Sequence, residues 1–123
     1  MMRFARRIRP HVDRELRAAC EARALGDAQG EFSHLERAHV LAQASTREHV
    51  RVHCRMLVWA LRNRDAREAV GQVLRVVGGV AKTPFGLVPR GNTGGANISP
   101  FRRLPVPGDL AGTIAAAHGE DRP

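Results

Sequence analysis

Four polar side chains between residues 36 and 53 have the types and the spacing that bind transition metals. They are Glu36, His39, His49 and His53. A glutamate three residues before a histidine places a carboxylate and an imidazole on one helix face, and two histidines four residues apart also share a face. Three imidazole nitrogens and a carboxylate oxygen suit zinc, iron, copper or nickel, whereas calcium and magnesium prefer oxygen ligands alone.

The turn at residues 44–46 decides whether these four groups meet. If the flanking helices fold back antiparallel about this turn, residues whose numbers have the same sum face each other. His39 then lies opposite His49, and Glu36 lies opposite His53, at nearly the same level. On a helical wheel the three histidines lie on the apolar sides of their helices. The spacing therefore predicts one buried site with four metal ligands.

Burial of these groups favours a metal over an unliganded arrangement. A buried imidazole needs a hydrogen-bond partner, and a buried carboxylate costs still more free energy without one. One metal ion would satisfy all four groups. Two other interpretations stay open. Glu36 could pair with His53, or with Arg3 or Arg6, in a structural polar network, or the histidines could be ordinary core residues that share a register by coincidence.

Other residues of the same region are assigned to the surface or the core. His34 points away from the apolar face, so we expect it at the surface. Cys20 could join the site from the first helix, although a site without it is favoured. Cys54 lies about 100° round the third helix from the site, so we expect it to pack. Met56 and Trp59 are expected to fill the core.

Apolar periodicity and capping signals predict four helices that position these groups. The helices span about residues 3–25, 28–44, 45–64 and 65 to between 77 and 80. Asp27 is the expected N-cap of the second helix. Ser45 with Glu48, and Asp65 with Glu68, have the spacing of capping boxes at the starts of the third and fourth helices. Pro10 interrupts the first pattern, so its first turns are expected to be kinked or separate.

The chain beyond the fourth helix changes in composition. Residues 83–110 are rich in proline and glycine and predict an irregular arm, which spaced apolar residues would pack against the helices. Within it, residues 90–99 read RGNTGGANIS, which favours a tight structural loop over an anion-binding nest. Residues 111–123 are expected to fray. We therefore predict one all-α domain over residues 1–123, with two antiparallel helical hairpins in a core over about 3–82.

The basic charge and the helical repeat supply two alternative functions. The formal net charge is +8, and Lys82 is the only lysine. The arginines are spread along the chain without interleaved aromatic residues, which favours solvated helix faces over arginine-mediated nucleic-acid binding. The two hairpins span about 35 residues each, near the tetratricopeptide period. A helical-repeat module that binds a protein partner without metal is therefore the first alternative.

Several kinds of sequence signal are missing from the chain. No apolar run reaches the length of a membrane span, and no signal-peptide pattern follows the basic N-terminus. Two cysteines do not make a disulfide framework, so we expect a cytoplasmic location. No Ser/His/Asp or Cys/His arrangement predicts a nucleophilic enzyme, so a binding role is favoured and enzymatic activity is left open. A catalytic metal with Glu36 as general base is the alternative. The oligomeric state is left open.

Four segments together resemble a bacterial family of unknown function, DUF3703. They are HLERAHVLAQ, HVRVH, GLVPRGNTGGANIS and LPVPGDL, and the resemblance covers about residues 10–110. It implies no particular reaction, but the occurrence of family members near metal-resistance genes favours the metal interpretation. No ligand is carried over from the family. We therefore predict a small cytoplasmic helical protein that binds zinc, iron or copper between its second and third helices.

Overall fold

The protein is built from helices alone in the part of the chain that the structure describes. The computed structural model describes residues 2–82 and 105–119, and these contain no strand. The helices are α1 Met2–Ala24, α2 Ala28–Ala42, α3 Thr46–Arg62, α4 Ala66–Lys82 and α5 Gly108–Gly119. The predicted all-α class is confirmed. Most of the expected irregular arm, including the loop at residues 90–99, lies outside the described residues.

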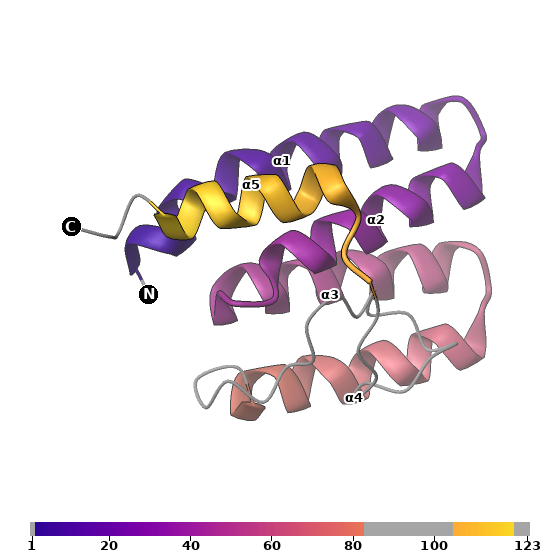
Figure 1. Ribbon diagram of the computed structural model, residues 1–123. Coiled ribbons are helices and arrows are strands. Elements are labelled where there is room, and N and C mark those ends of the chain that lie inside the picture. Colours follow the sequence, from indigo (N-terminus) through magenta and orange to yellow (C-terminus); the bar gives the residue numbers. More distant parts are fainter. Residues whose placement is uncertain (1, 83–104, 120–123) are drawn as a thin grey trace.

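From α1 to α4, helices that follow one another in the sequence lie side by side (Figure 1). Short turns join α1 to α2 and α3 to α4 at one end of the molecule, and the α2–α3 turn lies at the other end. Helix α2 packs against α3, and α5 packs against both α1 and α2. The two helices that carry the candidate ligands are therefore direct neighbours, as a site between them requires.

Side-chain caps fix where the three middle helices begin. The side-chain oxygens of Asp27, Ser45 and Asp65 accept hydrogen bonds from backbone N–H groups three residues later, at 2.9, 3.4 and 3.0 Å. Each bond satisfies one of the N–H groups that the first helical turn leaves without a partner. Gly26, at φ +74°, ends the turn after α1 in a conformation that glycine adopts without strain. These local signals therefore fix the first residues of α2, α3 and α4.

The core forms where the apolar stripes of the helices meet. Helix α1 contributes five buried residues at helical spacing: Phe4, Ile8, Val12, Leu16 and Ala19. Met56 and Trp59 are buried as predicted. The Trp59 indole N–H donates to the Ala28 carbonyl at 2.9 Å, and its ring packs edge-on against Phe32, with centroids 4.4 Å apart. This residue therefore joins α3 to the start of α2.

Pro10 does not divide the first helix. Helix α1 runs from Met2 to Ala24 with Pro10 inside it, so the prediction of a separate first piece is wrong. The proline ring lies on the exposed side of the helix. There, water can satisfy the carbonyl that loses its N–H partner, while the buried face of the helix continues through the position.

The fifth helix was not predicted. We expected residues 111–123 to fray, but residues 111–119 belong to α5. Leu110 and Ala117, seven residues apart, are buried on one side of this helix. The His118 ring stacks on Phe4 with centroids 4.1 Å apart. Burial against α1 and α2 stabilises a segment whose small residues and glycines carry little helical signal of their own.

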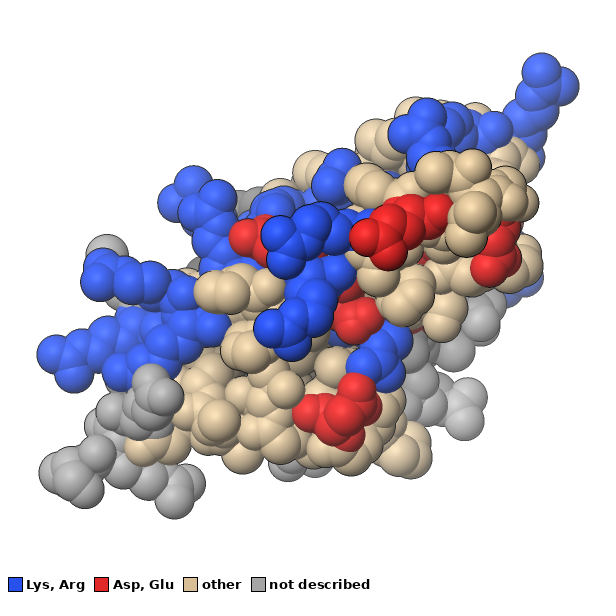
Figure 2. Space-filling model, turned by 90° about the horizontal axis from the view of Figure 1, so that it is seen from above, with Lys and Arg blue, Asp and Glu red and all other residues tan. Residues whose placement is uncertain are grey.

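Basic and acidic side chains are mixed over the surface of the helices. Figure 2 shows acidic groups among the basic ones on the face that it presents. Ion pairs connect different helices, among them Arg51 with Asp13, Arg37 with Glu15, and Arg62 with Glu31. Part of the arginine content therefore holds helices together. Among the helices of residues 2–82 and 105–119, none combines the length and the apolar character needed to cross a membrane.

Candidate metal centre

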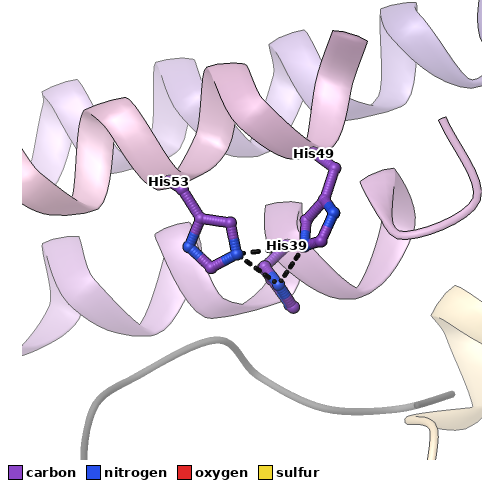
Figure 3. Close-up of side chains that lie close together, drawn as sticks. All are labelled: His39, His49 and His53. Carbon is purple, nitrogen blue, oxygen red and sulfur yellow. Dashed lines mark hydrogen bonds between the residues drawn. The ribbon is translucent and has the colours of Figure 1, made fainter. Parts of the chain in front are cut away.

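Three histidines from two helices meet at one point in the core. His39 extends from α2, and His49 and His53 extend from successive turns of α3 (Figure 3). Their Nε2 atoms are 3.0 Å apart in each of the three pairs. Their exposed fractions are 2%, 5% and 2% in that order. We call these three Nε2 atoms the histidine triangle.

The histidine triangle cannot be held together by hydrogen bonds alone. Each Nε2 atom either carries a proton and donates, or has a lone pair and accepts. Around a triangle, at least two of the three atoms have the same role. At least one 3.0 Å contact therefore joins two lone pairs or two N–H groups, which repel each other. A cation that accepts three lone pairs removes this conflict, because the same role then suits all three atoms.

The size of the triangle fits a bound transition metal. Imidazole nitrogens bind zinc at about 2.0–2.1 Å. Three nitrogens 3.0 Å apart all lie within reach of one ion at that distance, so the three histidines could hold it together. Such an ion would need at least one further ligand to reach the coordination number of four that zinc prefers.

His53 has a second set of contacts, with α4. Its Nδ1 atom lies 2.5 Å from Gln72 Oε1, and the Gln72 amide nitrogen donates to Glu68 Oε2 at 2.6 Å. Burial lowers the pKa of His53 to about 4; the bond to Gln72 opposes this shift, and the charge of Arg75 adds to it. The imidazole is therefore neutral near pH 7, which is the protonation state that a metal ligand needs.

Sequence reasoning did not identify Gln72 and Glu68 as part of this region. Gln72 is fully buried and Glu68 is 7% exposed. Their spacing of four residues, which places both on one face of the predicted fourth helix, was the available signal. It was too weak to use, because nothing in the sequence places that side of α4 against His53.

The structure brings three of the four predicted ligands together. Among the described residues, the group close enough to share an ion consists of His39, His49 and His53. Glu36 is half-buried one turn before His39 and is not in this group. His39 reaches both histidines of α3. Glu36 as a fourth ligand stays a prediction.

The other singled-out residues lie outside the site. His34 is apart from the cluster, as expected, and its Nδ1 atom lies 3.0 Å from Glu15 Oε1. Cys20 is exposed and is not part of the metal-ligand group. Cys54 is exposed as well, so the expectation that it packs is wrong. Its position, one residue after the buried His53, turns it out of the α2–α3 contact.

Comparisons with known proteins give one match. Neither the curated proteins nor the solved structures include one that matches this chain. A family model described as a protein of unknown function, DUF3703, matches residues 6–114. The match spans α2, α3 and α4 completely and α1 and α5 in part. It includes all three histidines of the triangle and confirms the resemblance seen in the sequence. The chain belongs to the DUF3703 family.

Proposed function

We propose that this protein binds one transition-metal ion between α2 and α3 through the histidine triangle. The observation that carries the proposal is the set of three buried Nε2 atoms, each 3.0 Å from the other two. Hydrogen bonds cannot satisfy all three contacts, and a cation can. Holding three imidazoles in such a cluster would destabilise the core unless a bound ion offset the repulsion.

The ligand chemistry selects a class of ion. Neutral imidazoles suit zinc, copper, iron and nickel, and they do not suit magnesium or calcium. Three protein ligands leave at least one coordination position for water, for another side chain or for a transferred group. We therefore propose storage, sensing or transfer of such an ion, in the service of metal homeostasis. A catalytic role would use the open position for an activated water molecule.

Glu36 is the proposed fourth ligand. It lies on α2 three residues before His39, half-buried, at the spacing that places a carboxylate and an imidazole on one helix face. A carboxylate at the open position would complete a tetrahedral set of three nitrogens and one oxygen. In a catalytic site the same group would instead accept a proton from metal-bound water.

Metal content of the purified protein tests the proposal. Untagged protein, reconstituted with zinc and then desalted, should retain one ion per chain by elemental analysis. The His39→Gln variant should retain none, because two histidines one turn apart cannot hold the ion against a desalting step. His34→Gln is the matched control, since it removes a histidine outside the triangle, and it should retain one ion. Wild-type protein that stays substoichiometric after reconstitution would rule out the function.

A second candidate function is a helical-repeat module that docks a protein partner. It would use the pairs α1–α2 and α3–α4 as two hairpins, in the manner of tetratricopeptide repeats. One observation favours it: large apolar side chains on α3 and α4 are at least half exposed. They are Val58, Leu61, Val70, Val73 and Leu74. Sedimentation of wild-type protein and of the Leu61→Glu/Leu74→Glu variant tests whether this surface self-associates.

A further inference from the structure

A chain of buried hydrogen bonds connects the histidine triangle to α4. His53 contacts Gln72, and Gln72 contacts Glu68, at 2.5 and 2.6 Å. Glu68 and Gln72 are four residues apart, so they lie on one face of α4 in successive turns. None of the three side chains is more than 7% exposed. The chain therefore works in an environment where water does not compete for its hydrogen bonds.

The donor and acceptor inventory fixes the direction of every bond in this chain. A carboxylate of Glu68 can only accept, so the amide nitrogen of Gln72 must face it. The amide oxygen of Gln72 then faces His53, and an amide oxygen also only accepts. Nδ1 of His53 must therefore carry a proton. Since a neutral imidazole carries one proton, Nε2 of His53 has a free lone pair, and this lone pair faces the histidine triangle.

We propose that Gln72 and Glu68 are positioning residues of the metal centre, which hold His53 in the Nδ1–H tautomer with Nε2 directed at the ion. This inference rests on the proposed function and deepens it, because it adds α4 to a site whose ligands lie on α2 and α3. Neither residue touches the ion. Gln72 orients the ring, and Glu68 orients Gln72.

Two physical effects give this arrangement consequences for affinity. Without an acceptor at Nδ1, the His53 imidazole would also populate the Nε2–H tautomer and other ring orientations. Metal binding would then have to restore both the tautomer and the orientation, which lowers the affinity. The Glu68 carboxylate, acting through the amide, also stabilises the positive charge that the ring shares with a bound cation. Removing outer partners of this kind lowers metal affinity by about 10–100-fold.

The competing explanation is that Gln72 serves only to join α3 and α4. Both explanations predict that Gln72→Leu destabilises the fold, because His53 loses its buried partner. Only the positioning role predicts that the folded Gln72→Leu variant binds metal more weakly than the wild type. The positioning role also predicts that zinc affinity depends on an acceptor for the His53 Nδ1–H group, whether an amide or a carboxylate supplies it. The exchange variant Glu68→Gln/Gln72→Glu keeps an acceptor for Nδ1–H and a donor behind it, with the same total charge.

Zinc affinity measured by competition with a chromophoric chelator at pH 7 tests the proposal. We expect Gln72→Leu to bind zinc about 10–100-fold more weakly than the wild type. The exchange variant should bind within a few-fold of the wild type or more tightly. Phe32→Leu is the stability control: it reduces a buried side chain on α2 that packs against Trp59, seven residues before His39, and should leave zinc affinity unchanged.

The outcomes separate this inference from the proposed function. If wild-type protein binds no zinc, both fail. If the wild type binds zinc and folded Gln72→Leu binds it equally well, only the inference fails. A readout without metal covers the case in which Gln72→Leu does not fold. In metal-free wild-type protein, ¹⁵N NMR should show a protonated Nδ1 and an unprotonated Nε2 for His53, and the opposite assignment would overturn the inference.

Discussion

Nε2 of His39 on α2 lies 3.0 Å from Nε2 of His53 on α3, although 14 residues separate them in the chain. His49 lies at the same distance from both. The contact ties two helices together through groups that repel each other in at least one pair without a cation. Folding and metal binding should therefore be coupled in this protein, and the predictions below depend on that coupling.

Zinc should raise the stability of the wild-type protein. An ion that binds only the folded state adds about 2.7 kcal/mol to the free energy of unfolding when free zinc is 100 times the dissociation constant. For a chain of this length the midpoint of thermal unfolding should rise by about 10 °C. Differential scanning calorimetry with zinc, and then with excess chelator, measures the shift. The His39→Gln variant should show no shift, and an equal shift in that variant would contradict the assignment.

Acid should weaken the metal-free protein through His53. Its pKa falls from 6.5 to about 4 on folding, mainly because of burial. Below pH 6.5 the unfolded chain therefore binds a proton that the folded protein excludes. The stability contributed by the neutral ring is complete above pH 6.5 and is lost progressively as the pH falls to about 4, with a total of about 3 kcal/mol.

Urea unfolding at several pH values between 7 and 4 measures this loss. Other groups also titrate in this range, so the difference between wild-type and His53→Gln proteins isolates the histidine. The wild type should lose more stability than the variant by about 3 kcal/mol. Parallel stability curves for the two proteins would show that His53 does not titrate in this way.

Glu36→Gln should separate the roles proposed for that carboxylate. If Glu36 is a ligand, its amide replacement binds zinc more weakly, though the loss should be smaller than that caused by removing a histidine of the triangle. The same titration of Glu21→Gln, which changes an exposed glutamate on α1, serves as the control. Identical zinc affinity in Glu36→Gln and wild type would remove Glu36 from the ligand set.

Leu110→Ala should destabilise the protein, because α5 is held by burial of its apolar side. Leu110 is 4% exposed, and removing a buried leucine side chain costs about 2–4 kcal/mol. Leu25→Ala is the matched control, since Leu25 is 85% exposed and its replacement should change stability by less than about 0.5 kcal/mol. Equal effects of the two substitutions in urea unfolding would show that α5 does not pack as described.

Local signals account for the parts of the fold that the sequence predicted. The caps at Asp27, Ser45 and Asp65 act within one helical turn, so they can be recognised from four consecutive residues. The missed helix α5 depends on Leu110 and Ala117 finding a surface on α1 and α2, and no local pattern reports such a surface. The same reason explains Cys54, whose exposure depends on how α3 is rotated against its neighbours.

The sequence by itself determined that His39, His49 and His53 face one another. Two fixed quantities suffice for that result: the helical repeat, and one short turn that brings α2 back along α3. The tertiary structure decided that Glu36 lies outside the group of three and that Gln72 and Glu68 support His53. Both outcomes depend on how α4 packs against α3 and on the positions of the terminal atoms of long side chains. Helical periodicity fixes which face a residue occupies, but only packing fixes which atoms touch.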